Sequence, residues 1–289
     1  MQPAFQKVVI FGVGLIGGSF SLALRKADKV TEVVGFGRSV ATLNEARQLG
    51  ILDRIGGDVA LEVRDADLVL IATPVAQISG IFARIAPHLG AKTLVTDGGS
   101  TKSDVVAAAR ANLGGKLPQF IPAHPIAGAE KSGASAAQAD LYQGKKVVLT
   151  PLPENSQEAV ARVRRAWEWC GAAVSEMTPE QHDAVFAAVS HLPHLLSFAL
   201  VHDLAQRDNK DLLLSFAASG FRDFTRIAAS SPEMWRDICM ANREALMREL
   251  QQYAAELYVL HQALENNDAA KLEEMFSLAR KVRSGWTQQ

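Results

Sequence analysis

Short runs of apolar, largely β-branched residues alternate with amphipathic stretches through the first half of the chain. These apolar runs predict strands over residues 7–11, 32–36, 66–72, 93–96 and 146–150. Between them, apolar residues at helical spacing predict helices over 40–49 and 75–89, and a further helix that runs through Ala111. Alternation of this kind favours an α/β fold with a parallel sheet and helices on both faces. In such a sheet, ligands bind beyond the carboxyl ends of the strands.

The pattern changes near Thr178, after which no strand is predicted. Thr178-Pro179-Glu180-Gln181 is typical of a capping box, and Ser231 followed by Pro232 predicts a second helix start. From Met234 the apolar positions predict a helix of about 30 residues, about 45 Å long at 1.5 Å per residue. A helix of that length buries its apolar face more easily against a second copy of the chain, so we expect a homodimer. The domains are predicted to cover 1–177 and 178–289.

The first predicted strand leads directly into a glycine-rich turn, G-V-G-L-I-G, and then into a helix. Gly12 permits the tight turn, Gly14 lets the backbone approach a pyrophosphate, and Gly17 lets helix and strand pack closely. The free N–H groups of the helix start, at Leu15 and Ile16, face the phosphates. The chain is therefore predicted to bind a dinucleotide in a Rossmann-like domain.

The second strand is expected to end in an acidic residue that holds the adenosine ribose, and none is present. Gly37-Arg38-Ser39 stands there instead. An arginine can pair bidentately with a 2′-phosphate and a serine can donate a hydrogen bond to it, so the sequence favours NADP, with NAD possible. Thr73 and Pro74, after the strand over 66–72, are expected to line the same cofactor site.

Composition narrows the function classes. The 289 residues are 48% hydrophobic and 21% charged, with 30 basic and 31 acidic residues and a net charge of −1. No overall field favours nucleic acid or an anionic membrane. The predicted strand begins too close to the N-terminus for a signal peptide, and no apolar run is judged long enough to cross a membrane. We expect a soluble, cytoplasmic protein.

Several polar residues stand out as candidates for chemistry. His124 follows a strand within A-H-P-I-A-G, where Pro125 restricts the backbone. Ser100 follows another strand and is interpreted as a helix cap that can also hydrogen-bond a catalytic imidazole. A surface-loop histidine and a purely capping serine are the alternatives.

A second group lies in the helical half. His191 and His194 lie one helical turn apart in S-H-L-P-H, and Pro193 between them is expected to kink the helix. A third metal ligand is not evident, so no metal is predicted; satisfied core histidines are the alternative. Arg222 and Arg226 lie among apolar residues and need an anion, either a carboxylate such as Asp223 or Asp237 or that of a substrate. Trp235 can form the wall of a ring-binding pocket.

Taken in order, G-V-G-L-I-G-G-S, D-G-G-S-T-K, A-H-P-I-A-G, S-H-L-P-H and G-F-R-D-F-T-R-I-A resemble the prephenate/arogenate dehydrogenase family of tyrosine biosynthesis. The resemblance implies a Rossmann-like N-terminal domain, a C-terminal all-helical dimerisation domain, and NAD(P)-dependent oxidative decarboxylation of prephenate or arogenate. It implies that His124 contacts the ring hydroxyl, that Ser100 supports it near the nicotinamide, and that Arg226 binds the ring carboxylate. His191, His194 and Trp235 would shape the pocket, and Arg222 is a nearby basic residue that can also be structural.

Two alternatives stay open on the sequence. One is another Rossmann oxidoreductase, such as a β-hydroxyacid dehydrogenase, which would use a catalytic lysine, for which Lys102 is a poor candidate. The other is a non-catalytic NADP-sensing protein, which would not need His124 and Arg226. The choice between prephenate and arogenate depends on a residue near the substrate side chain, and the loop after His124 offers three candidates: Glu130, Asp140 and Gln143.

Overall fold

The structure is a computed structural model that describes residues 3–128 and 133–286. The chain divides into two compact units, Met1–Arg243 and Glu244–Gln289. The first compact unit includes residues 178–243, so the two units meet at 243/244, whereas the predicted domains meet at 177/178. The boundary at 177/178 stays a prediction.

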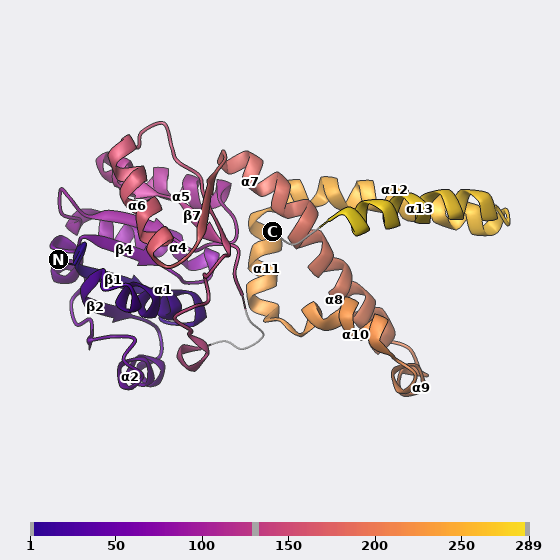
Figure 1. Cartoon of the computed structure of the whole chain (residues 1–289), viewed down its shortest axis with the longest axis horizontal. Coiled ribbons are helices and arrows are strands. Elements are labelled where there is room, and N and C mark those ends of the chain that lie inside the picture. The colour runs from indigo at the N-terminus through magenta and orange to yellow at the C-terminus, as the bar shows by residue number, and fades with distance from the viewer. Residues whose placement is uncertain (1–2, 129–132, 287–289) are drawn as a thin grey trace. The chain divides into compact units, whose positions relative to one another are not determined.

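The N-terminal part of the first unit contains a parallel sheet (Figure 1). The sheet has six strands in the order β3-β2-β1-β4-β5-β6. Its strands are β1 (Phe5–Phe11), β2 (Val30–Phe36), β3 (Arg54–Ile55), β4 (Leu68–Ile71), β5 (Leu94–Asp97) and β6 (Phe120–Ile121). The strand order reverses between β1 and β4, and at such a switch point the loops that leave the carboxyl ends diverge and leave room for a ligand. The predicted α/β fold is confirmed.

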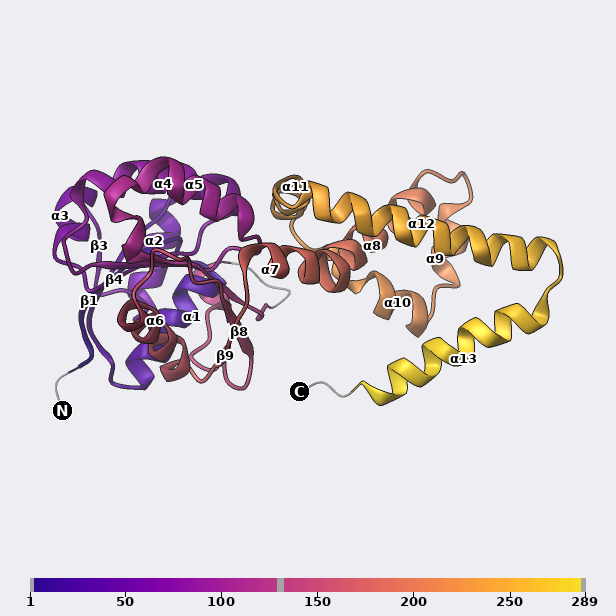
Figure 2. The same cartoon turned by 90° about the horizontal axis from the view of Figure 1, so that it is seen from above.

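Helices cover both faces of this sheet (Figure 2). Alternate residues of its strands pack into two separate cores. Val8 and Ile10 of β1 face the core that includes α1, α2 and α6, whereas Val9 and Phe11 face the core that includes α3, α4 and α5. The six helices are α1 (Leu15–Lys26), α2 (Val40–Gln48), α3 (Val59–Arg64), α4 (Val75–Ile85), α5 (Ser103–Leu113) and α6 (Gln157–Trp169). Two apolar faces on every strand explain why the strands read as continuous apolar runs.

A second, three-stranded sheet continues from the first. It contains β7 (Ala123–Pro125), β8 (Lys146–Leu149) and β9 (Ala173–Glu176), with β7 antiparallel and β9 parallel to β8. One residue, Pro122, separates β7 from β6, so the chain passes from one sheet to the other at the carboxyl edge of β6. This step places His124 at the edge where a parallel sheet binds its ligands.

The rest of the first unit is helical in the residues that the structure describes. Its helices are α7 (Pro179–Phe186), a π turn (Ala187–His191), α8 (Leu192–Ala205), α9 (Lys210–Ser215), α10 (Ser219–Thr225), a 3-10 turn (Arg226–Ala229) and α11 (Pro232–Ala241). The capping box at Thr178 is confirmed, since the Gln181 N–H donates to its Oγ1 at 3.2 Å and its own N–H donates to the Gln181 side chain at 3.1 Å. The cap at Ser231 is also confirmed.

The predicted helix of about 30 residues from Met234 is wrong in one respect, because it is broken at Asn242. α11 ends at Ala241, and α12 (Arg243–Glu265) begins after a residue with φ −106° and ψ 32°. The Asn242 side chain is buried and donates a hydrogen bond to the Asp183 carbonyl at 2.8 Å. A polar partner on another helix therefore fixes this residue outside helical geometry, and apolar periodicity does not record such a partner.

The second unit consists of α12 from Glu244 onward and α13 (Ala269–Gly285), joined by a short turn. Asp268 caps α13 by accepting a hydrogen bond from the Lys271 N–H at 2.9 Å. The large apolar side chains exposed on this hairpin include Leu257, Tyr258, Leu264, Phe276, Leu278, Val282 and Trp286. An αα-hairpin with this much exposed apolar surface is typical of an oligomeric interface.

One helical run departs from the expectation that no segment is long enough to cross a membrane. Pro179–Ala205 is 27 residues long, with a mean hydropathy of 1.7, and is therefore long and apolar enough to cross a membrane. Length and hydropathy are weak evidence for a single helix, because apolar helices of soluble proteins have the same properties. Buried polar residues of the candidate site lie on this run, as described below.

Candidate functional site

The turn between β1 and α1 has the geometry of a phosphate-binding loop. Gly12 has φ +91°, and a Cβ there would lie 2.5 Å from the Ala72 carbonyl oxygen. A Cβ on Gly17 would lie 2.2 Å from the Gly12 carbonyl oxygen, whereas one on Gly14 would meet no atom within 4 Å. Gly12 and Gly17 thus allow the fold to close, and Gly14 borders open space, as close approach of a pyrophosphate requires.

The surroundings of this turn also fit a dinucleotide. No side chain caps the N-terminus of α1, so the N–H groups of Leu15 and Ile16 stay available to an anion. Thr73 Oγ1 is buried and has no hydrogen-bond partner in the part of the chain that the structure describes. Thr73 also lies against Gly12, and Pro74 after it is the N-cap of α4. A buried hydroxyl without a partner beside a phosphate-binding turn is suited to a polar ligand.

The end of β2 carries the residues that are predicted to select the cofactor. Gly37, Arg38 and Ser39 are all exposed. The Ser39 hydroxyl accepts a hydrogen bond from the Thr42 N–H at 3.2 Å as the N-cap of α2, and it keeps its own proton to donate.

A buried ion pair fixes the backbone just before His124. Asp97 and Lys102 are fully buried and pair with each other. Asp97 Oδ1 accepts a hydrogen bond from the Ala123 N–H at 3.0 Å, and Lys102 Nζ donates to the Ala123 carbonyl at 2.7 Å. Both backbone groups of Ala123 are thus bound to one ion pair. The ammonium of Lys102 is enclosed in this pair, which agrees with the expectation that it is a poor catalytic lysine.

His124 lies against two residues of α7. Its Nδ1 is 2.8 Å from His182 Nε2, and His182 Nδ1 is 2.8 Å from Asp183 Oδ1. The Phe186 ring packs edge-on against His124, with 4.9 Å between centroids. His182 is fully buried and Asp183 nearly so, whereas His124 is half-buried. Three side chains therefore form a line that ends at the more accessible His124 ring.

The electrostatics of this line keep both imidazoles neutral. Burial lowers the pKa of His124 well below 6.5, and the charge of Lys102, like that of His182 or His191 whenever either is protonated, lowers it further. Burial also lowers the pKa of His182, although Asp183 opposes the shift. Burial raises the pKa of Asp183, but hydrogen bonds from His182, Ser103 and Lys102 outweigh it and leave that pKa lowered. At neutral pH the line therefore consists of two neutral rings and one carboxylate.

The structure contradicts the interpretation of Ser100 as a helix cap, because α5 begins at Ser103 and its N-cap is Lys102. The capping group comes from α7 instead: Asp183 Oδ1 accepts from the Lys102 N–H and Oδ2 from the Ser103 N–H, both at 2.8 Å. Ser100 lies in the preceding bend, where its main chain hydrogen-bonds the buried His191 ring. Its predicted role beside His124 stays a prediction.

His191 belongs to the same polar cluster. It is almost fully buried, and its Nδ1 is 3.1 Å from Asn242 Nδ2, the group that also donates to the Asp183 carbonyl. Burial lowers the pKa of His191 to about 4. His191 is the last residue of the π turn and lies two residues before Pro193. π turns of this kind are frequent at functional sites.

Two members of the second predicted group, His191 and His194, pack against Trp235. Its ring stacks on His194 with 3.6 Å between centroids, and His194 Nδ1 donates to the Ser190 carbonyl at 2.9 Å. Burial lowers the pKa of His194, the hydrogen bond to Ser190 opposes this shift, and the charge of Arg226, an exposed residue, adds to it. Trp235 Nε1 is buried without a hydrogen-bond partner in the described ranges. Arg222 is exposed on α10.

Two sets of residues remain: Asp223 and Asp237 as possible partners of the arginines, and Glu130, Asp140 and Gln143 as candidates for contact with the substrate side chain. Asp223 is exposed on α10. Asp237 is bound to Arg236 at 2.6 Å. Glu130 lies outside the described residues. Asp140 and Gln143 are exposed, and the Gln143 side chain lies against Gly171. None of these positions, within what the structure describes, identifies a group that senses the substrate side chain.

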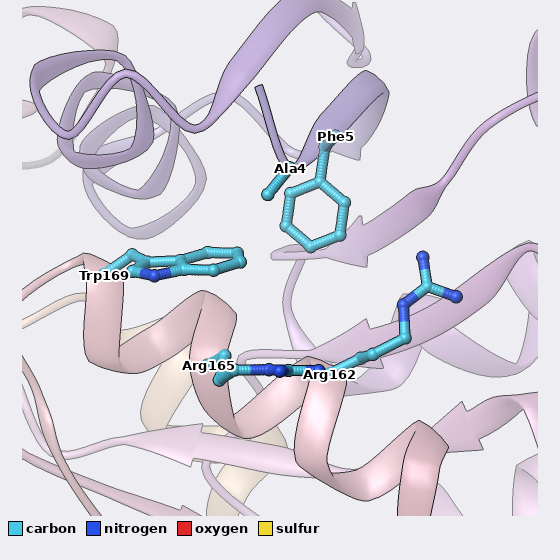
Figure 3. A pocket seen from close by; sticks show the side chains of 5 residues that line it. All are labelled: Ala4, Phe5, Arg162, Arg165 and Trp169. Atoms are coloured by element: carbon cyan, nitrogen blue, oxygen red, sulfur yellow. The ribbon is translucent and has the colours of Figure 1, made fainter. Parts of the chain in front are cut away.

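The cofactor turn and His124 lie at the same edge of the sheet. A Cβ on Gly98, after β5, would lie 3.0 Å from Ile16 at the start of α1 and 3.8 Å from Pro125. By contrast, a pocket of about 260 Å³ lies near the amino end of β1 (Figure 3), and its lining residues are Ala4, Phe5, Arg162, Arg165 and Trp169. Because β1 starts at Phe5, this pocket belongs to the opposite edge from the candidate site.

Sequence reasoning located His124 and the glycine turn but missed His182, Asp183 and Asn242. The sequence does place His182 and Asp183 in the first turns of a helix that begins with a capping box. Adjacent residues of a helix point in different directions, so these two polar side chains face different surroundings. What the sequence does not show is that α7 packs against α5 and directs both side chains inward.

A doubly wound sheet with a phosphate-binding turn and a neutral, half-buried imidazole at the same edge is typical of an NAD(P)-dependent oxidoreductase. Comparison with known proteins agrees. The sequence model of the prephenate dehydrogenase nucleotide-binding domain matches residues 20–176, and that of the prephenate dehydrogenase dimerization domain matches residues 178–278. The chain belongs to the prephenate dehydrogenase family.

Individual relatives support the same assignment. The chain is 36% identical over 288 residues to prephenate dehydrogenase of Bacillus subtilis strain 168, which covers 99% of this chain and 77% of the relative. Its structure is similar to that of Aquifex aeolicus prephenate dehydrogenase in complex with hydroxyphenyl propionate and NAD+, with a TM-score of 0.90, 36% identity and coverage of 96% and 97%. Synechocystis arogenate dehydrogenase is similar as well, with a TM-score of 0.82, 29% identity and coverage of 98% and 100%.

Proposed function

We propose that this dehydrogenase catalyses the oxidative decarboxylation of a cyclohexadienol, arogenate or prephenate, with hydride transfer to a nicotinamide dinucleotide. One observation carries the proposal: the half-buried, neutral imidazole of His124 lies at the sheet edge that also holds the phosphate-binding turn. A base in that position can accept a hydroxyl proton while the cofactor, when bound, accepts the hydride. Loss of CO2 then makes the ring aromatic and supplies the driving force.

The chain's own residues are given distinct tasks in this proposal. His124 accepts the ring hydroxyl proton, and Ser100 supports it near the nicotinamide. Arg226 binds the ring carboxylate mainly in the ground state, because tight pairing in the transition state would oppose loss of CO2. His194 and Trp235 form the wall of the pocket, and the unpartnered Trp235 Nε1 can donate to the substrate.

Two further residues, His191 and Arg222, complete the proposed pocket. His191 shapes the pocket from behind through Asn242 and the Ser100 main chain. Arg222 supplies positive charge near the pocket entrance or supports α10. A neutral hydrogen-bond donor in the pocket admits the keto-acid side chain of prephenate, whereas a carboxylate there favours the ammonium group of arogenate. We infer that arogenate is used well, and that prephenate is a second substrate.

We infer further that NADP is preferred, because Arg38 and Ser39 follow β2 and no carboxylate stands at Gly37. We also infer a homodimer formed through the helical segment. α8 is apolar on all sides, yet within it only Leu192 and Ser197 are buried, and α13 exposes Phe276 and Leu278. A second copy of the chain would cover such surfaces. Cytoplasmic location stays a prediction.

Replacing the proposed base tests the mechanism. His124→Asn is expected to lower kcat by about 10²–10⁴, the usual contribution of general acid–base catalysis, with KM little changed. In the wild type, kcat/KM is expected to be level at neutral pH and to fall on the acid side below pH 6.5, because the pKa of His124 is lowered by burial. Steady-state kinetics from pH 5 to 9 measure both, and a near-normal kcat in the variant would overturn the role.

Arg226 provides a test of substrate anchoring. Arg226→Ala is expected to raise KM for the dienol by about 10², because a charge-assisted pair with a carboxylate contributes about 1.5–3 kcal/mol. KM for the nucleotide is expected to stay constant. Arg236→Ala is the control, since that guanidinium is exposed and already bound to Asp237. Equal loss of both affinities in Arg226→Ala would show a structural arginine instead.

Cofactor choice depends on Arg38. The wild type is expected to show the higher kcat/KM with NADP, and Arg38→Ala is expected to lower that value about tenfold or more while the value with NAD changes little, because only NADP carries the 2′-phosphate. Arg47→Ala, on the last turn of α2, serves as a control for loss of a nearby positive charge. A higher kcat/KM with NAD in the wild type would contradict the preference.

Substrate identity is tested by parallel measurement. The kcat/KM for arogenate is expected to equal or exceed that for prephenate, with both compounds measured at saturating NADP. A preference for prephenate of tenfold or more, about 1.4 kcal/mol, would overturn this order.

A further inference from the structure

We propose that His182 and Asp183 are positioning residues that set the tautomer of His124 and accept its positive charge during the reaction. The proposal rests on the proposed function, because it assigns a task to the groups behind the base. It concerns side chains that do not face the substrate and that the candidate roles above leave without one.

His124, His182 and Asp183 are joined by two short contacts between ring nitrogens and a carboxylate oxygen. His124 Nδ1 and His182 Nε2 are 2.8 Å apart, and His182 Nδ1 and Asp183 Oδ1 are also 2.8 Å apart. Each ring nitrogen of His182 therefore has one hydrogen-bond partner, and the ring is fully buried. If the group at the end of the line can only accept hydrogen bonds, just one arrangement of protons on the ring nitrogens allows both hydrogen bonds to form.

The acceptor at the end of the line is Asp183. Its two oxygens already accept hydrogen bonds from the Lys102 and Ser103 N–H groups, and a carboxylate in that position can accept but not donate. His182 Nδ1 must therefore carry a proton and donate it to Oδ1. In the neutral ring, Nε2 is then unprotonated and accepts from His124 Nδ1–H. His124 is left with a free lone pair on Nε2, the nitrogen that is not engaged with α7.

The same line of residues can move positive charge away from His124. When His124 Nε2 takes the hydroxyl proton, the proton on its Nδ1 can pass to His182 Nε2. One N–H bond breaks and one forms, and the positive charge moves from the first ring to the second. The groups that act on His124 are His182, Lys102 and His191, and all of them oppose a cation there. Burial and Lys102 also oppose a cation on His182, but two carboxylates, Asp183 and Asp97, favour it there, and no carboxylate acts on His124 in this way.

The position of Asp183 is fixed independently of the histidines. Its side chain caps α5, and its carbonyl accepts from the buried Asn242. A carboxylate held in place in this way needs no reorganisation when the charge arrives, which is the condition for electrostatic stabilisation of a transition state. Removal of the Asp183 carboxylate would also weaken the cap of α5, so an experiment has to separate the loss of stability from the loss of catalysis.

The experiment uses the full chain with NADP bound and ¹⁵N-labelled histidine, in the wild type and in three variants. In the wild type, ¹⁵N chemical shifts at neutral pH are expected to show His124 protonated at Nδ1 and unprotonated at Nε2. In Asp183→Asn the amide can donate to His182 Nδ1, so both rings change tautomer. We expect kcat to fall about 10²-fold or more, as in other catalytic histidines with the wrong tautomer, with KM within about threefold of the wild type.

The two other variants separate the tasks. In His182→Gln the side-chain carbonyl can still accept from His124 Nδ1–H, so the tautomer is expected to stay and kcat to fall only about tenfold, because the charge cannot move on. Asp58→Asn is the matched control: Asp58 caps α3 by accepting from the Ala60 N–H at 2.8 Å, and no histidine is bound to it. It is expected to keep kcat and both KM values.

The outcomes are distinct from those of the proposed function. His124 protonated at Nε2 in the wild type would overturn the proposal, as would a folded Asp183→Asn with kcat within threefold of the wild type. Should Asp183→Asn not fold, the wild-type spectrum and His182→Gln still decide. Failure of the proposed function shows elsewhere, as a near-normal kcat in His124→Asn, and leaves the tautomer measurement intact.

Discussion

The buried ion pair between Asp97 and Lys102 is the constraint on which the rest of the site depends. Two fully buried charges cost several kcal/mol each to desolvate, and the cost is offset only by close pairing and by hydrogen bonds to the remaining polar atoms. Here those hydrogen bonds go to both backbone groups of Ala123. The residue after Ala123 is His124, so satisfaction of the ion pair fixes the main chain from which the proposed base extends.

The same segment connects the site to α7. The Lys102 N–H, at the start of α5, donates to Asp183, and Asp183 lies next to the residue that contacts His124. The loop after β5 therefore has two tasks. Its Lys102 ammonium holds the main chain next to His124, and the N–H groups at the start of α5 hold the Asp183 carboxylate. Removal of either charge would leave the other buried without its partner, which costs far more than the loss of one hydrogen bond.

Much of this arrangement could be predicted from sequence, and the missing part has a single cause. Val8 to Phe11 and Gly12 to Gly17 are adjacent in the chain, so strand, turn and helix follow from local pattern. His124 follows a strand end, which local pattern also shows. Asp183 caps a helix that starts 80 residues earlier, and Asn242 breaks a helix because of a carbonyl 59 residues away. Apolar periodicity does not contain such long-range polar pairs, and they overturned the expectations about Ser100 and the long helix.

The burial that keeps His124 neutral also makes it a weak base, since a lowered pKa reduces its affinity for the proton it must accept. Two features compensate. Formation of an aromatic ring drives the reaction, so the base needs to stabilise charge only briefly. The carboxylate of Asp183 lies one ring behind the base, where it interacts little with a neutral His124 and strongly with a proton that moves to His182. An interaction that strengthens only as charge develops lowers the barrier without tightening substrate binding. A carboxylate placed directly on His124 would instead have raised its pKa in the resting enzyme and left less of the ring neutral.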